Sequence, residues 1–388
     1  MAACLLSLFV GLAGGEVAAR WLGTETDFVT PAAVSDRGRV HDAETLSRPN
    51  ARFLWVGHPG RRREFEVFVR NNSLGFHDEE HALRKRPGWK RVLVVGDSFV
   101  QALQVPLQAG MPRQLARRLR SRGGPVDVVA VAQSGWGPVE YGAAIAEWAP
   151  RLDADVVVCC FYPGNDVRNA SKEAERLFAK QVAGPLGQLW NRTETKDLPG
   201  LLVPSSRLNA LLARLVVLHQ LRGRFAAWEF EYKIPVDFYV FTEERFPFVE
   251  EGWRTLSQEV AAVKKELAAQ GRLLLVTSTS DAFRLHRDAK VLRRQLARDY
   301  PEAARWHWDF GRFEARLGSI LSSLEIPYVD LERRLAARMR SAGRICHFPA
   351  DGHWNEEGHA WAAEELEPRV SELLGFSGSR VSTSPFNP

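Results

Sequence analysis

Short apolar runs and longer amphipathic stretches alternate along most of this chain. The runs are rich in valine, leucine and isoleucine, as expected for strands buried on both faces, and they lie at 91–96, 126–132, 155–162, 272–277 and 326–330. The stretches between them have apolar residues at helical spacing and predict helices at 111–121, 138–148, 253–269 and 311–324. This alternation predicts an α/β fold, a flavodoxin-like three-layer α/β/α sandwich with a parallel five-stranded sheet. A helical insert interrupts the pattern.

The chain begins with an apolar segment that carries no charged side chain before Glu16. This segment is shorter than the ~20 residues that a helix needs to cross a bilayer, and it lacks the basic leader of a signal peptide. We expect residues 1–22 to be an N-terminal membrane anchor or signal, with a buried N-terminal helix as the alternative. The first reading implies membrane contact through the N-terminus and a location in the cell envelope, either membrane-anchored or exported.

Three further regions fall outside the regular alternation. Residues 23–90 form a lead-in and linker region, irregular over 21–65 and followed by an alternating strand at Glu64–Val69. The insert at 167–250 is rich in proline, glycine and aromatic residues and contains an amphipathic helix over 208–221. It is expected to be either a lid over the site or a helical hairpin packed beside the core. The tail at 376–388 is rich in serine and proline and is expected to be disordered.

Composition narrows the class of protein without identifying it. The 388 residues are 45% hydrophobic and 26% charged, which suits one large soluble α/β domain over 91–375. The net charge of +5 comes from scattered arginines, with no dense basic stripe, so nucleic acid is not an expected partner. Four cysteines form no disulfide framework, and no Cys/His spacing suggests a metal site. Neither a cofactor nor a metal is expected, and the sequence leaves the oligomeric state open.

Ser98 is the first candidate for chemistry. It follows the apolar run Val92–Val95 and the strand-breaking pair Gly96-Asp97, where a helix can begin. In a parallel sheet this point is the carboxyl edge, at which ligands bind. Asp351 and His353 lie on a loop near the other end of the chain and can both approach a nucleophile. The chain order Ser, Asp, His is one that triad hydrolases use, although Ser98 alone could equally be a helix cap.

Two blocks between these residues complete a recognisable set. They are Gln133-Ser134-Gly135-Trp136-Gly137 and Gly164-Asn165-Asp166, and each follows a predicted strand. With all four blocks in order, the chain resembles the SGNH (GDSL-type) hydrolase family over roughly residues 66–375. The resemblance implies a catalytic set of Ser98, Asp351 and His353, and an oxyanion hole built from Ser98, Gly135 and Asn165. It also implies that Asp97 and Asp166 hold loops through backbone hydrogen bonds.

The sequence departs from the family pattern at several positions. The acid stands two residues before the histidine, where many members have three, and this shorter form resembles the membrane-linked and polysaccharide-acetylating branches. In membrane-linked members of the family, the segment upstream of the serine usually has an arginine where this chain has His77. The segment after the serine is often glycine-rich, whereas this chain has Gln101 there. His359 falls within a predicted helix and is expected to be structural, while His347 is a weaker candidate for the base.

The leading functional prediction is a serine esterase that cleaves an O-acyl ester, with acetyl on a carbohydrate as the favoured case. A second is an O-acyltransferase that modifies an exported polysaccharide through the same acyl-enzyme. A third is a non-catalytic, carbohydrate-binding envelope protein that retains the fold. The full set of five site residues argues against the third, and the choice between the first two depends on which acceptor reaches the acyl-enzyme.

Overall fold

The fold is described from a computed structural model. The described residues are 47–56, 64–182, 234–280, 282–285, 288–349 and 351–376, together with a few positions before residue 36. The predicted helix over 208–221, most of the predicted N-terminal anchor and nearly all of the predicted disordered tail lie outside the described residues.

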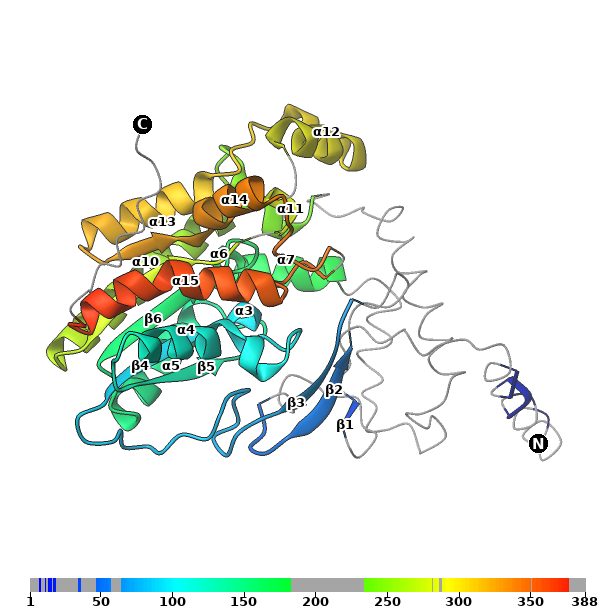
Figure 1. Ribbon diagram of the computed structural model, residues 1–388. Coiled ribbons are helices and arrows are strands. Elements are labelled where there is room, and N and C mark those ends of the chain that lie inside the picture. The colour runs from blue at the N-terminus through cyan, green and yellow to red at the C-terminus, as the bar shows by residue number, and fades with distance from the viewer. Residues whose placement is uncertain are drawn as a thin grey trace, which may run out of the picture.

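A parallel sheet of five strands forms the centre of the molecule, with the strand order β5-β4-β6-β7-β8 (Figure 1). This is the flavodoxin-like order that the sequence predicts. The strands are β4 (Lys90–Gly96), β5 (Val126–Ala132), β6 (Val156–Phe161), β7 (Leu273–Ser278) and β8 (Tyr328–Asp330). All five strands agree with the predicted runs to within about two residues.

Alternate residues of each strand supply two separate cores. One face carries Leu93 and Cys159, and the other carries Val94 and Cys160, so the two neighbouring cysteines point to opposite faces of the sheet. The first face is covered by α5 (Pro138–Arg151), α10 (Pro247–Ala269) and α13 (Arg312–Ser323). The second is covered by α4 (Met111–Ser121), α14 (Leu331–Ala342) and α15 (Glu356–Leu373).

The described residues also contain further helices and turns. They are α3 (Ser98–Gln101), α6 (Asp166–Asn169), α7 (Lys172–Val182), α11 (Ala282–Leu285) and α12 (Ala289–Asp299), with 3-10 turns η1 (Leu107–Ala109), η2 (Val236–Phe241) and η3 (Pro301–Arg305). The helix predicted over 253–269 begins earlier, at Pro247, so the last residues of the predicted insert (167–250) belong to α10 and pack on the core. The helix α14 was not predicted.

A second, antiparallel sheet lies upstream of the domain and beside it in Figure 1. It contains β1 (Val34–Ser35), β2 (Arg52–Val56) and β3 (Glu66–Arg70). The expectation that residues 21–65 are irregular is therefore wrong for β1 and β2, which are stabilised by pairing with a neighbour along the chain. The strand predicted at 64–69 is confirmed, although it begins two residues later and ends one residue later than expected.

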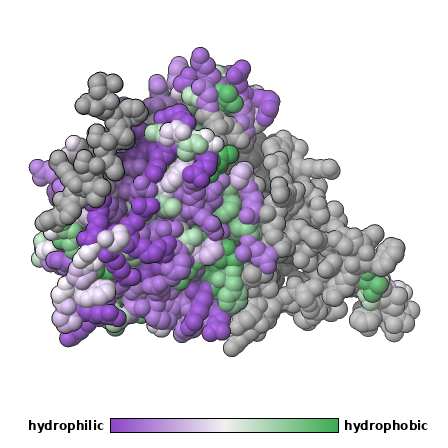
Figure 2. Space-filling view, viewed as in Figure 1, coloured by the Kyte–Doolittle hydropathy of each residue, from purple (hydrophilic) through white to green (hydrophobic). Residues whose placement is uncertain are grey.

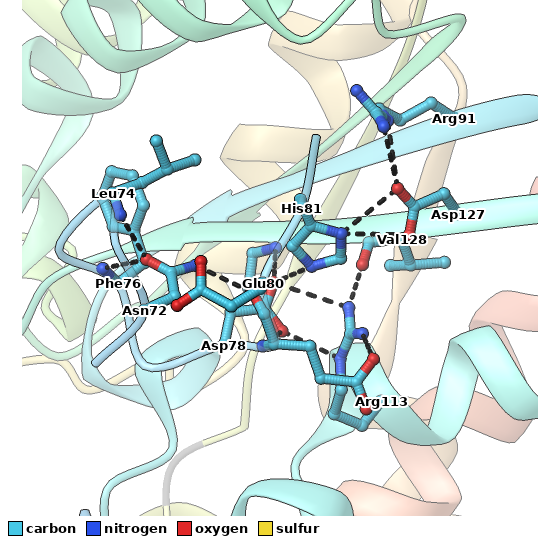
Figure 3. Close-up of polar contacts among 12 residues, drawn as sticks. Asn72, Leu74, Phe76, Asp78, Glu80, His81, Arg91, Arg113, Asp127 and Val128 are labelled. Carbon is cyan, nitrogen blue, oxygen red and sulfur yellow. Dashed lines mark hydrogen bonds and ion pairs between the residues drawn. The ribbon is translucent and has the colours of Figure 1, made fainter. Parts of the chain in front are cut away.

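The segment after β3 covers the outer edge of β5, which is an edge strand of the parallel sheet. Asp78 accepts a hydrogen bond from the Ala130 amide at 2.7 Å, and Arg113 donates to the Val128 carbonyl. These two side chains and their neighbours form a buried polar cluster (Figure 3). Because unpaired edge groups would otherwise be buried without partners, this cluster fixes the lead-in region to the domain.

Most of the face over α4 and α15 is hydrophilic, while apolar residues gather in a strip over β2 and β3 (Figure 2). Phe68 on β3 contributes to the exposed apolar surface, with 65% of its area accessible. Within the residues that the structure describes, no helix is both long and apolar enough to cross a membrane.

Candidate active site

Ser98 is the first residue of α3 and lies directly beyond the carboxyl end of β4. The preceding Asp97 caps this helix, because its Oδ1 accepts a hydrogen bond from the Phe99 amide at 3.0 Å. Since β4 lies between β5 and β6, the turn after it opens at an interior position of the carboxyl edge of the sheet. Ser98 is only partly buried there, while Asp97 and Phe99 on either side are fully buried.

The loop that carries Asp351 and His353 folds back on itself before α15. The Phe348 amide donates to the His353 carbonyl at 2.8 Å, and Trp354 is completely buried at the base of the loop. Gly352 has a φ of +91°, a conformation that residues with a Cβ rarely adopt. This turn at the central residue allows an acid and a histidine only two positions apart to lie side by side.

The structure brings the three predicted residues together in one hydrogen-bonded chain. His353 Nε2 lies 2.7 Å from Ser98 Oγ, and His353 Nδ1 lies 2.6 Å from Asp351 Oδ1. An ionised carboxylate can only accept, so Nδ1 carries the proton and Nε2 is free to accept the serine hydrogen. The His353 ring also packs against Phe99, with ring centroids 4.8 Å apart, which fixes the imidazole beside the serine.

The surroundings of His353 raise the pKa of its imidazole above the ordinary value of 6.5. Burial opposes the charged form and would lower the pKa, but the charge and hydrogen bond of Asp351 and the charge of Asp97 outweigh it. The side chain keeps 23% of its surface accessible. A base of this kind is neutral above its raised pKa and readily holds a proton taken from a nearby hydroxyl.

The three residues that the family resemblance assigns to the oxyanion hole follow three neighbouring strands. Ser98 follows β4, Gly135 follows β5 and Asn165 follows β6. Within the described part of the chain, no acceptor is found for the amides of Ser98 and Gly135 or for the side-chain amide of Asn165. Gly135 has a φ of +83°, and its backbone reaches the surface. Donors at this edge without protein acceptors are what a negatively charged oxygen requires.

Two buried carboxyl groups lie beneath this edge. Asp97 and Asp166 are both inaccessible to solvent, and Asp166 Oδ2 accepts a hydrogen bond from the Tyr162 amide at 2.7 Å. Both therefore hold backbone amides, as the sequence analysis expects. Burial raises the pKa of each carboxyl, and the charge of Asp97 raises that of Asp166 further.

A second serine–histidine pair lies close by, between Ser280 and His347. Ser280 Oγ is 2.9 Å from His347 Nε2, but the two residues are only 0% and 1% exposed. The Ser280 hydroxyl also accepts a hydrogen bond from the buried Trp354 ring at 2.5 Å, and Cys346 Sγ faces the other imidazole nitrogen. This pair anchors the loop of His353 to the end of β7 and presents no nucleophile to solvent.

His359 is a structural residue, as its position within a predicted helix indicates. It is buried within α15, and its Nδ1 accepts a hydrogen bond from the Met111 amide at 3.2 Å. Burial lowers the pKa of the imidazole to about 3, so this ring is neutral at ordinary pH. Among the described residues, no group of three or more histidine, cysteine, aspartate or glutamate side chains could hold a metal ion.

The lead-in region reaches the site as well, which the sequence did not indicate. Glu64 accepts a hydrogen bond from the Asp351 amide at 2.9 Å, and Phe65 contacts Phe348 with ring centroids 4.9 Å apart. On the other side of the site, the Ser47 hydroxyl donates to the Gln133 side chain at 2.5 Å. The upstream segment therefore supports the loops on both sides of Ser98.

Comparison with solved structures finds many distant matches. They include SGNH/GDSL lipolytic esterases. TesA is 15% identical over 73% of this chain and 99% of its own, with a TM-score of 0.38. The acetyl xylan esterase AlAXEase is 12% identical over 72% of this chain and 99% of its own, with a TM-score of 0.39. A GDSL-like lipase from Bacteroides thetaiotaomicron is 10% identical over 73% of this chain and 88% of its own, with a TM-score of 0.34. No family model and no curated protein matches the sequence.

Proposed function

We propose that this protein is a serine hydrolase that cleaves an O-acyl ester through Ser98, His353 and Asp351. The observation that carries the proposal is the unbroken chain of hydrogen bonds from Ser98 Oγ through both nitrogens of His353 to Asp351. A serine hydroxyl becomes nucleophilic when an oriented base takes its proton. Three donors without acceptors on the neighbouring strand ends support the same chemistry.

In the proposed acylation, Ser98 Oγ attacks the ester carbonyl carbon while its proton passes to His353 Nε2. Asp351 stabilises the imidazolium that forms, and it keeps the ring in the required orientation. The carbonyl oxygen becomes negatively charged and accepts from the amides of Ser98 and Gly135 and from the Asn165 side chain. Each such donor contributes on the order of 3 kcal/mol to stabilising the transition state. His353 then returns the proton to the departing alcohol.

Deacylation repeats these steps with a second acceptor. His353 takes a proton from water in a hydrolase, or from a sugar hydroxyl in an O-acyltransferase that modifies an exported polysaccharide. We propose an acetyl group on a carbohydrate as the substrate class, because the Asp-x-His spacing of Asp351 and His353 resembles the polysaccharide-acetylating branch of the family. The same resemblance keeps acyl transfer as the second candidate function.

We also propose that the protein acts in the cell envelope. The uncharged run at the beginning of the chain supports an anchor or a signal, which would bring the enzyme into contact with exported carbohydrate esters.

The test is turnover of p-nitrophenyl acetate and of an acetylated xylan, each with and without an unmodified polysaccharide acceptor. A hydrolase releases acetate at a rate that the acceptor does not change. An acyltransferase instead transfers acetyl to the acceptor, which mass spectrometry detects. If the purified full chain binds the polysaccharide but neither releases nor transfers acetyl, it is a binding protein, and the proposal is wrong.

A further inference from the structure

The loop that carries Gly135 is tied to the helix that carries Ser98 by a single buried side chain. Gln101 is the last residue of α3 and is 3% exposed. Its Oε1 accepts hydrogen bonds from both the Ser134 amide, at 2.9 Å, and the Ser134 hydroxyl, at 2.7 Å. The Gln101 carbonyl in turn accepts from Nδ1 of buried His77, at 2.9 Å. Burial lowers the pKa of His77, so the ring is neutral and Nδ1–H is a fixed donor.

The other side of the same loop is tied to the turn after β6. The hydroxyl of Tyr141, a residue 1% exposed on α5, lies 3.2 Å from the Trp136 carbonyl and 3.0 Å from Asp166 Oδ1. A hydroxyl has one hydrogen for these two acceptors. The Tyr141 hydroxyl therefore donates toward both acceptors, with the shorter contact to Asp166 Oδ1, and so links the turn of Trp136 to the turn of Asp166. Asp166 is also the residue after Asn165.

These two contacts enclose Gly135 on both sides. Ser134 precedes it and is held to the nucleophile's helix, while Trp136 follows it and is held to the turn that carries Asn165. All three donors of the proposed oxyanion hole are thus connected by side chains that do not themselves reach the reacting atoms.

We propose that Gln101 and Tyr141 are positioning residues that fix the Gly135 amide relative to Ser98 and Asn165, and so determine the turnover rate rather than substrate binding. This inference rests on the proposed function. An oxyanion donor acts only when it is held close to hydrogen-bond distance from the oxygen, and a displacement of about 1 Å can reduce the rate on the order of 100-fold. Ground-state binding of a small ester depends much less on this distance.

The test compares kcat and KM for p-nitrophenyl acetate in single variants of the full chain. Gln101→Met keeps the volume of the side chain but removes the acceptor, and Tyr141→Phe removes only the hydroxyl. We expect kcat to fall about 10- to 100-fold in each variant, with KM changed less than about 3-fold. Ser134→Thr keeps both hydrogen bonds to Gln101 and should retain most of the wild-type kcat, whereas Ser134→Ala should lose part of it.

Tyr239→Phe is the matched control, since Tyr239 is an equally buried tyrosine of the same core whose ring packs against Phe246, Phe248 and Trp306. It should leave kcat unchanged, and thermal unfolding should report a folded protein for every variant used. The inference is overturned if folded Gln101→Met and Tyr141→Phe keep the wild-type kcat, or if Ser134→Thr loses as much as Ser134→Ala. Failure of the proposed function gives a different result, because the wild-type chain itself then has no measurable turnover.

Discussion

His353 is the residue whose protonation controls the proposed reaction, because only its neutral imidazole can take the serine proton. Asp351 holds the ring through one short hydrogen bond and raises the pKa of the imidazole. The same pairing therefore aligns the base, strengthens it and moves its titration above pH 6.5.

The pH dependence of kcat/KM follows directly. Since the raised pKa belongs to the free enzyme, the logarithm of kcat/KM should rise with slope one through an inflection above pH 6.5 and then level off. Asp351→Asn removes the charge that raises the pKa of His353, so the inflection should move down and the plateau should fall by about 1000-fold or more. Circular dichroism at each pH confirms that the enzyme is folded. A flat profile between about pH 5 and 8 contradicts a histidine base.

Gly135 allows a second test at the level of one residue. Its φ of +83° strains any residue with a Cβ, although an added methyl group would meet no atom within 4 Å. Gly135→Ala should therefore destabilise the fold by about 1–2 kcal/mol and move the donor amide, lowering kcat about 10- to 100-fold.

Gly88→Ala is the matched control for this substitution, because Gly88 has a φ of +77° and equally open space but lies in the turn before β4. It should cost a similar free energy of unfolding, measured in urea, with no change in kcat. Equal kcat values for the two variants would mean that the Gly135 amide takes no part in the reaction.

The site residues differ in how far sequence could predict them. Ser98 was recognisable because a strand and a break precede it, and Asp351 and His353 because their loop precedes a helix near the end of the chain. Gln101 and Tyr141 carry no such signal, since Ser134 lies 33 positions from Gln101 and Asp166 lies 25 positions from Tyr141, and only the fold brings these pairs together. The sequence likewise gives no sign that Glu64 accepts a hydrogen bond from the Asp351 amide, because Asp351 lies 287 positions later.

At the scale of elements, a buried polar cluster attaches the lead-in segment to the edge strand β5. His81 lies between two carboxylates, with Nε2 3.1 Å from Asp78 and Nδ1 3.1 Å from Asp127 (Figure 3). Although burial opposes the charge, these hydrogen bonds and charges raise the pKa of His81 to about 9. Arg91 and Arg113 complete the cluster as partners of the same two aspartates.

This cluster makes stability depend on pH in a defined direction. A histidine with a pKa of about 9 when folded, and about 6.5 when unfolded, stabilises the fold fully below pH 6.5 and loses this effect as pH rises through 9. The contribution is about 3 kcal/mol. The difference in unfolding free energy between wild type and His81→Gln should therefore shrink by about that amount from pH 6 to pH 10.

The control is His307→Gln, because His307 is paired with Glu244 but its side chain is 78% exposed. Its unfolding free energy should follow that of wild type in urea titrations at each pH. If His81→Gln shows the same constant difference from wild type at pH 6 and pH 10, His81 is not charged in the folded protein.

Strands and helices are predictable from the sequence where the apolar pattern lies within the element itself, and less so where the element depends on pairing with another segment. The strands of the parallel sheet are short runs buried on both faces, and every one was found from its composition. The strand β2 was missed because it depends on pairing with β3, and prolines and glycines around it favoured an irregular segment. The helix α14 carries a local signal as well, since Leu331, Leu335 and Met339 recur at helical spacing after the capping residue Asp330, and its absence from the prediction has no structural reason.

At the scale of the whole molecule, the proposed envelope location connects the N-terminal run with the site. The full chain should fractionate with membranes or be exported when it is expressed in a bacterial host. Replacing Leu8 and Val10 by lysine interrupts the apolar run and should leave the protein in the cytosolic fraction, because charges oppose insertion. Leu83→Lys, on an exposed side chain of the domain, is the control and should not change the distribution. Recovery of the wild-type chain in the cytosol alone contradicts the proposed location.

The identity of the nucleophile tests the central claim most directly, since both Ser98 and Ser280 lie within hydrogen-bond distance of a histidine. The wild-type chain should react with a fluorophosphonate and gain one adduct by intact mass, which peptide mapping assigns to Ser98. Ser98→Ala should give no adduct. Ser280→Ala should still be labelled on Ser98, because buried Ser280 only supports the histidine loop. An adduct on Ser280, or full labelling of Ser98→Ala, would contradict the account.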